Sequence, residues 1–178
     1  MASTSTSKQA MLVDRPLHSF ARIGNTACLS SSTNLNSINA SGCTLIVDCS
    51  ANDGAVIDSM SVIENEANVT ASRICVFISV AVSASLITNL NTAYVTGVTI
   101  GGSGLVGTRT NIPLPPLSVP VPCLASPAAS VSAYPDEVDK KNTGLYVPSG
   151  ALLYVGTNVV LTNPASTQLT VFAQGGFF

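Results

Sequence analysis

The chain has 178 residues, of which 46% are hydrophobic and only 9% are charged, and its formal net charge at pH 7 is −2. This share of hydrophobic residues argues against a disordered chain, and the length suits one domain with an ordinary core. The small negative charge leaves no positive surplus to neutralise phosphates, so we expect no nucleic-acid partner.

Residues 1–24 begin with a run of serine and threonine and then contain Met11, Leu12, Val13 and Phe20. This start lacks the basic residues and the continuous apolar centre of a secretory signal, so we expect the protein to stay in the compartment where it is made. Apolar residues on an otherwise polar segment favour a docking role. We therefore predict that residues 1–24 form an extended N-terminal arm and that these four side chains contact a partner.

Residues 73–83 show the clearest local period in the chain. Ile74, Val76 and Ile78 fall on one side of an extended backbone, and Cys75 and Phe77 fall on the other. This alternation is the two-residue period of a β-strand. The charge-free region around it, residues 74–108, is interrupted by serine, threonine and asparagine, whereas a membrane-spanning helix needs about 18 apolar residues in succession. We expect no contact with a membrane.

Short runs rich in β-forming residues recur along the rest of the chain and are separated by turn formers. Besides 73–83 they lie at residues 43–49, 56–64, 86–99, 117–121, 144–147, 152–155, 158–161 and 168–173. One of the turns is Pro148-Ser149-Gly150, in which Gly150 supplies the positive φ that reverses the chain. Many short strands without an amphipathic helix predict an all-β fold, a jelly-roll-like antiparallel β-sandwich formed as one domain by residues 25–178.

A proline-rich segment interrupts this rhythm at residues 113–135, which hold seven of the ten prolines and no charge. Proline favours an extended conformation and cannot occupy a central strand, so we predict a loop insertion that packs against another subunit or a shell. Leu117 and Val119 are its candidate contact residues. The next six residues, 136–141, carry five charges. We interpret them as a solvated loop tip, because a calcium loop would need a different spacing of oxygen ligands.

Five cysteines occur at positions 28, 43, 49, 75 and 123, and no two of them have the spacing of a zinc site. An odd number without a secretory signal predicts reduced thiols in a protein made in a reducing cytosol. A disulfide between Cys43 and Cys49 is the only local pairing left open.

Residue types that perform acid–base or metal chemistry are few and scattered. The single histidine, His18, has no serine or cysteine partner that the sequence singles out, and the glycine-rich residues 101–107 lack the lysine of a phosphate-binding loop. We predict no catalytic site, no cofactor and no metal, and hence a protein that is not an enzyme.

The shortage of charge itself carries information, since a soluble domain usually has about 25% charged residues. Interface cores are depleted in charge, so a surface of this kind is typical of a subunit in an assembly. We predict that the isolated chain forms a homotrimer. At the C-terminus, Gly175 and Gly176 allow the backbone to bend so that Phe177 and Phe178 insert into the end of the barrel or into a neighbour.

Several stretches resemble small virion proteins of tailed bacteriophages, over about half of the chain. They are Thr33-Asn34-Leu35-Asn36, residues 57–63, residues 70–78, and the ending formed by 143–156 and 169–178, with its Pro-x-Gly turn and its final Gly-Gly and aromatic residues. The resemblance implies a jelly-roll cement or decoration protein that binds the outer surface of the capsid. The implied partner is the major capsid protein, and the implied location is the virion after synthesis in the host cytoplasm.

Two other classes remain as alternatives. A receptor-binding or fibre/tail-tip module of the same virion would have the same fold and the same trimeric habit, but the aromatic content of 5% does not favour it. A small β-sandwich hydrolase would need a pair of acids or a catalytic triad, and the sequence shows neither pattern.

Overall fold

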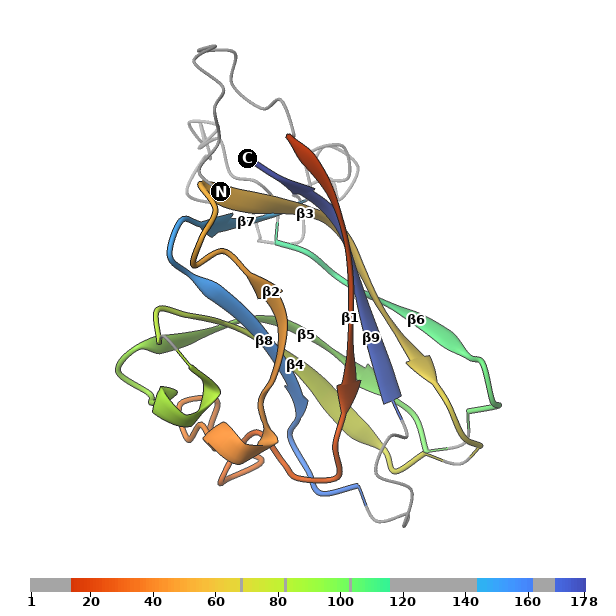
Figure 1. The fold of residues 1–178 in the computed structure, drawn as a ribbon. Helices are drawn as coiled ribbons and strands as arrows, with labels where there is room; N and C mark the ends of the chain where they lie inside the picture. The colour runs from red at the N-terminus through yellow and green to blue at the C-terminus, as the bar shows by residue number, and fades with distance from the viewer. Residues whose placement is uncertain (1–13, 68, 82, 103, 116–143, 162–168) are drawn as a thin grey trace, which may run out of the picture.

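Two antiparallel sheets face each other in the computed structural model, which describes residues 14–67, 69–81, 83–102, 104–115, 144–161 and 169–178 (Figure 1). The five-stranded sheet has the order β1-β9-β3-β6, with β7 also paired to β3, and the four-stranded sheet has the order β2-β8-β4-β5. The strands are β1 (Arg15–Ile23), β2 (Thr44–Asp48), β3 (Gly54–Glu64), β4 (Ser72–Ser79), β5 (Thr92–Ile100), β6 (Arg109–Ile112), β7 (Leu145–Pro148), β8 (Leu152–Thr157) and β9 (Leu169–Phe177).

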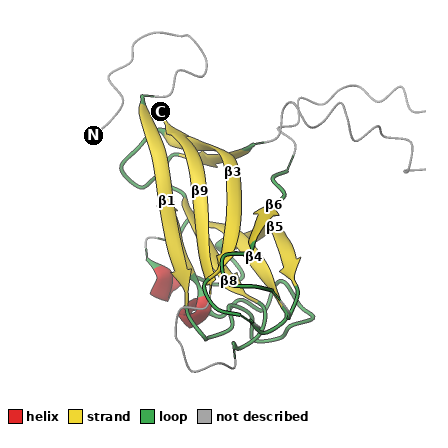
Figure 2. Cartoon of the chain, turned by 90° about the vertical axis from the view of Figure 1, so that its right-hand side faces the viewer, coloured by secondary structure: helices red, strands yellow, loops and turns green. Residues whose placement is uncertain are grey.

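The order of the strands defines the topology. Strands β1, β3, β6, β7 and β9 form one sheet, and strands β2, β4, β5 and β8 form the other. The chain therefore changes sheet after every strand except β4 and β6, each of which is followed by a strand of its own sheet. This is the strand order of a jelly roll, in which two Greek keys close a sandwich. The predicted all-β, jelly-roll-like sandwich is therefore confirmed. In Figure 2 β1, β9 and β3 lie side by side along one face.

The core lies between the inner faces of the two sheets. Its best-buried side chains, each fully enclosed, include Ile57 and Val62 from β3, Leu169 from β9, Leu153 from β8 and Ile74 from β4. Full burial of one such side chain contributes about 1.5–3 kcal/mol, so this layer supplies most of the favourable free energy of folding.

The middle of strand β4 is buried on both faces, which explains its unbroken apolar run from Ile74 to Ile78. Ile74 and Val76 point into the main core, as the predicted alternation requires. Cys75 and Phe77 point to the other side, where the chain before β2 covers them, together with the short 3-10 helices η1 (Ala40–Gly42) and η2 (Ala84–Leu86). We call this second layer, defined by Cys28, Leu29, Cys43, Cys75, Phe77, Ala81, Ile87, Leu152 and Tyr154, the outer cluster.

The prediction of an extended arm over residues 1–24 is wrong for residues 15–23. Residues Arg15–Ile23 are an edge strand that pairs with β9 along its whole length, so the sandwich begins at Arg15 rather than at residue 25. Leu17, Ala21 and Ile23 face inward and are buried. These residues lie an even number of positions apart, which is the spacing that puts side chains on one face of a β-strand. Residues 1–13 lie outside the described part.

Three local predictions differ from the structure. Residues 158–161 do not form a strand; Asn158 instead bonds through its backbone and its side chain to the backbone of Arg73. The strand expected over 86–99 begins only at Thr92. The short strand β6 does not stand out in the sequence. The expected strand at 117–121 and most of the proline-rich segment lie outside the described residues.

The described thiols are free, as predicted, and all four of them are buried. Cys49 packs in the main core, whereas Cys43 belongs to the outer cluster, so the structure does not bring Cys43 and Cys49 together as a pair. Cys123 lies outside the described residues. The described helices, η1 and η2, have three residues each, and neither could cross a membrane.

Candidate interaction surface

Phe20 stands on the outer face of the five-stranded sheet and is 62% exposed. Its ring packs against that of its cross-strand partner Phe172, with 6.2 Å between the ring centroids. Side chains two residues away on a strand share a face, so His18 and Arg22 flank Phe20 on the same exposed surface. The position is compatible with the contact role predicted for Phe20.

The two C-terminal aromatic residues pack mainly against their own chain. Phe177 lies against the main core, and the guanidinium of Arg15 stands 5.3 Å from the centre of its ring. The Phe178 ring is 6.0 Å from that of Tyr146, and its N–H donates a hydrogen bond to the carbonyl oxygen of Gly54. Both side chains are half-buried on their own chain, and the insertion of this tail into a neighbour stays a prediction.

The other candidate contact residues lie outside the described part of the chain. They are Met11, Leu12 and Val13 of the predicted arm and Leu117 and Val119 of the proline-rich segment.

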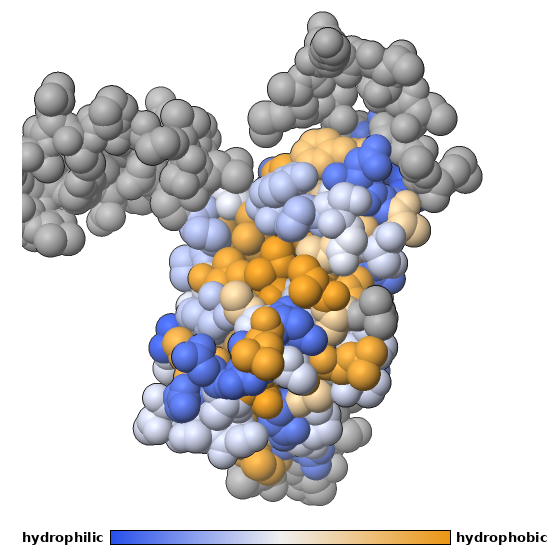
Figure 3. Space-filling view, turned by 90° about the vertical axis from the view of Figure 1, so that its left-hand side faces the viewer, coloured by the Kyte–Doolittle hydropathy of each residue, from blue (hydrophilic) through white to orange (hydrophobic). Residues whose placement is uncertain are grey.

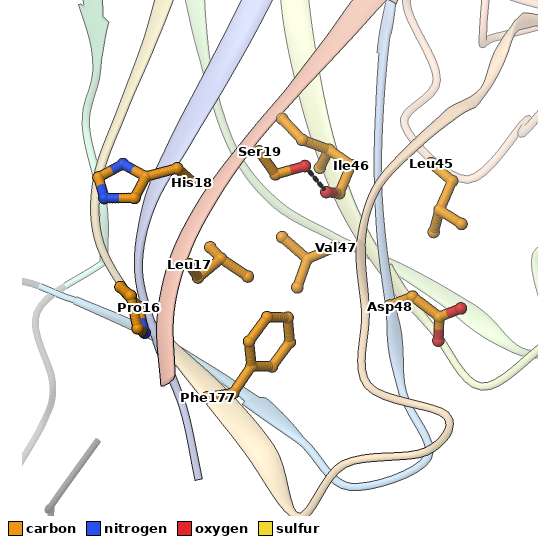
Figure 4. Close-up of a pocket in the computed structure, with 9 residues that line it drawn as sticks. All are labelled: Pro16, Leu17, His18, Ser19, Leu45, Ile46, Val47, Asp48 and Phe177. Atoms are coloured by element: carbon orange, nitrogen blue, oxygen red, sulfur yellow. Dashed lines mark hydrogen bonds between the residues drawn. The ribbon is translucent and has the colours of Figure 1, made fainter. Parts of the chain in front are cut away.

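A shallow pocket opens where the edge strands β1 and β2 meet (Figure 4). Leu17 and Val47 line it, and Ser19 Oγ donates a hydrogen bond across it to the carbonyl oxygen of Ile46. The ionisable residues of the lining, His18 and Asp48, lie on opposite sides and do not point toward each other. The pocket therefore offers no acid–base pair, and it joins two sheet edges rather than enclosing a ligand.

Exposed apolar side chains gather at the connection between β4 and β5. Val80 is 69% exposed, Leu86 53% and Leu90 93%, and we call these three residues the hairpin patch. Val80 and Leu90 line a shallow hollow together with Ile78 and Ala93. No residue from 74 to 108 carries a charge. On this side of the molecule hydrophobic residues reach the surface in several neighbouring groups, shown in orange in Figure 3.

Polar side chains inside the connection hold the patch in place. Asn91 accepts a hydrogen bond from the Thr88 N–H and donates one to the Leu86 carbonyl oxygen, each 2.8 Å long. Ser79 Oγ donates to the carbonyl oxygen of Asn91 and accepts from the Ala81 N–H. A loop fixed by its own side chains loses little entropy on binding, so apolar area presented in this way is converted efficiently into affinity.

The hairpin patch is not among the surfaces predicted from the sequence. The alternation of residues 73–83 includes Val80, and the strand expected over 86–99 includes Leu86 and Leu90. A signal is present nonetheless, because serine and asparagine recur around these apolar residues without a two-residue period, which is typical of a loop.

One buried carboxyl group lies far from this surface. Glu64, at the end of β3, is 3% exposed, and its Oε2 has no hydrogen-bond partner. A side chain at Gly104 would collide with this carboxylate, which shows how closely the β5–β6 connection covers it. Burial raises the pKa of the Glu64 carboxyl above its ordinary value of 4.5.

We expect Glu64→Gln to stabilise the protein at pH 7 and not at pH 4. Because the pKa of Glu64 is raised in the folded state, this carboxyl group costs the folded state no stability below pH 4.5, where it is protonated in both states. As the pH rises above 4.5, the group ionises more easily in the unfolded state, and the folded state loses stability. Removing an unpaired buried charge should raise the free energy of unfolding by about 1–3 kcal/mol at neutral pH. Thermal unfolding at both pH values measures it, with the exposed Asp58→Asn as the control. An equal gain at pH 4 and pH 7 would contradict the assignment.

Among the described residues no three His, Cys, Asp or Glu side chains are placed so that they could hold a metal ion. Comparison of the chain with protein-family models, with curated proteins and with solved structures finds no match in any of the three.

Proposed function

We propose that this protein is a non-enzymatic structural component of a virion, a cement or decoration protein that binds the outer surface of a tailed-phage capsid and stabilises the head. The observation that carries the proposal is the hairpin patch, an apolar surface without charge on a connection held by its own hydrogen bonds. The resemblance of the chain to small virion proteins supports the same class.

An uncharged surface of this kind favours a protein partner. Cores of protein–protein interfaces are depleted in charged residues, and exposed apolar patches on soluble proteins commonly mark interaction sites. A nucleic acid would require a basic surface, and the net charge of the chain is −2. The major capsid protein and further copies of this chain are the partners that we propose.

Two separate surfaces allow both kinds of contact. The hairpin patch lies on the connection that leads into β5, at an edge of the four-stranded sheet. Phe20 lies on the outer face of the other sheet, on edge strand β1. We propose that the hairpin patch contacts the capsid and that the Phe20 face contacts neighbouring copies within a homotrimer.

The direct test is binding of the purified protein to capsids assembled without it. We expect saturable binding in a fixed copy number per capsid, measured by co-sedimentation and quantitative gel densitometry, and a higher temperature for disruption of the occupied heads. Absence of binding to heads would contradict the proposed function.

The oligomeric state is tested separately by sedimentation equilibrium. A shortage of charge and an exposed aromatic pair lead us to expect a species of three times 18.1 kDa at micromolar concentration. Phe20→Asp should shift this species toward the monomer, because a charge cannot be buried without a partner. A wild-type protein that sediments only as a monomer would contradict the trimer.

A receptor-binding or fibre/tail-tip module is the second candidate. Its supporting observation is the exposed Phe20 ring beside Phe172, since aromatic surfaces also serve recognition. Binding of the isolated protein to host cells rather than to capsids would favour this function.

A further inference from the structure

Three buried thiols meet in the outer cluster, although they come from three separate parts of the chain. Cys75 on β4 is the cross-strand partner of Gly156 on β8. Thr44 on β2 is the partner of Val155, so Cys43 lies beside Gly156 on its other flank. Gly156 thus lies between Cys43 and Cys75. Because it has no side chain, the space over its Cα atom on this face of the sheet is open to another residue.

Cys28 occupies that space. A Cβ atom added to Gly156 would stand 2.5 Å from the Cβ of Cys28 and 3.0 Å from its Sγ. The backbone on either side of Cys28 is held in position, since its N–H donates to the carbonyl oxygen of Thr157 and its carbonyl oxygen accepts from the N–H of Asn39. The thiol of Cys28 is therefore the central one of the three.

The backbone of Cys28 also lies directly against the residue before Cys43. A Cβ atom on Gly42 would be 2.1 Å from the carbonyl oxygen of Ala27 and 2.5 Å from the nitrogen of Cys28. The side chain of Asn39 donates a further hydrogen bond to the same carbonyl oxygen of Ala27. The two ends of the 28–43 segment are thus in contact through their backbones.

Hydrogen bonding within the cluster makes the three thiols unequal. Hydrogen bonding to Cys28 lowers the pKa of Cys43 and of Cys75 and raises the pKa of Cys28 itself. The Cys43 thiol also donates to the carbonyl oxygen of Asn39, and the Cys75 thiol donates to that of Arg73. Cys43 is 8% exposed, whereas Cys28 and Cys75 are fully buried. Cys43 is therefore the thiol of the three that a reagent in solution reaches first.

We propose that Cys28 and Cys43 form an oxidisable pair, which a low-molecular-weight disulfide converts into an internal disulfide. The Cys43 thiolate attacks one sulfur of the reagent, forms a mixed disulfide and releases one thiolate. The Cys28 thiol then loses its proton to solvent as its sulfur attacks the Cys43 sulfur, and the second thiolate leaves. Two protein thiols are oxidised, one reagent disulfide is reduced to two thiols, and Cys75 remains a thiol.

This bond would close the chain from Cys28 to Cys43 into a loop over the outer face of the four-stranded sheet. A closed loop restricts the unfolded chain more than the folded one, so oxidation should stabilise the protein. The inference is independent of the proposed function, because it concerns the chemistry of the chain in any oxidising surroundings.

The test uses the full-length protein incubated with oxidised glutathione. We expect the loss of two thiols in a titration under denaturing conditions, a peptide containing Cys28 linked to Cys43 in the mass spectrum, and a thermal midpoint higher by about 5–10 °C. Dithiothreitol should reverse all three changes. A stable glutathione adduct without an internal bond, or no reaction at all, would overturn the proposal.

Single variants identify the pair. Cys49→Ser removes a buried thiol of the main core and should leave the linked peptide and the loss of two thiols unchanged. Cys43→Ser and Cys28→Ala should each abolish both, and circular dichroism checks that each variant keeps its β-sheet signal. If Cys28→Ala does not fold, Cys43→Ser alone decides the question. A Cys28–Cys75 bond formed equally well in Cys43→Ser, or any bond to Cys49 or Cys123, contradicts the assignment.

Discussion

The double variant Val80→Asp/Leu90→Asp should bind capsids at least ~100-fold more weakly than the wild type, and its fold should be unchanged. Both side chains are exposed in the isolated chain, at 69% and 93%, so aspartate there disturbs no packing. At an interface each replacement loses apolar contact and leaves a charge to be buried, and a loss of 100-fold corresponds to only about 2.7 kcal/mol. Co-sedimentation of a dilution series with capsids measures the affinity.

The double variant Leu105→Asp/Val106→Asp is the matched control for this experiment, because it also adds two charges. Leu105 and Val106 are apolar and 76% and 66% exposed, but they belong to the β5–β6 connection at the opposite end of β5. The length of β5 separates the two connections by roughly 25–30 Å. Equal losses in the control and in the variant would show that added negative charge alone weakens binding. Full binding by Val80→Asp/Leu90→Asp would remove the hairpin patch from the interface.

Deletion of residues 1–24 should unfold the protein, whereas deletion of residues 1–13 should leave it folded. The longer deletion removes β1, exposes the edge of β9 and uncovers the contacts of Leu17, Ala21 and Ile23. Loss of these contacts costs on the order of 5 kcal/mol, which is comparable to the whole stability of a small domain. Far-ultraviolet circular dichroism and thermal unfolding measure both deletions.

The shorter deletion tests the remaining part of the predicted arm. It removes Met11, Leu12 and Val13 and keeps every residue of β1. If these three residues contact a partner, the folded protein should lose capsid binding or dissociate from the trimer, which co-sedimentation and sedimentation equilibrium measure. A folded, trimeric and fully binding product would show that residues 1–13 have no docking role. A folded product of the longer deletion would show that β1 is dispensable.

The sequence by itself determined the structural class of this protein and much of its local detail. The alternation around Ile74 predicts β4, and the structure places Ile74 and Val76 in the main core. Gly150, which the turn pattern predicts to reverse the chain with a positive φ, has φ 78°. Both features are encoded in adjacent residues, because a strand period and a turn depend on backbone and side-chain preferences over a few positions.

Only the tertiary structure decided which distant segments meet. The sequence predicts an arm over residues 1–24, because the segment begins with a run of serine and threonine, but residues Arg15–Ile23 are a strand through their pairing with β9 at the other end of the chain. The hairpin patch lies on a connection because β4 ends at Ser79 and the strand expected from residue 86 begins only at Thr92. The three thiols of the outer cluster meet because the register of β2, β8 and β4 brings them around Gly156. Such contacts depend on strand pairing over long sequence separations, which local periodicity does not encode.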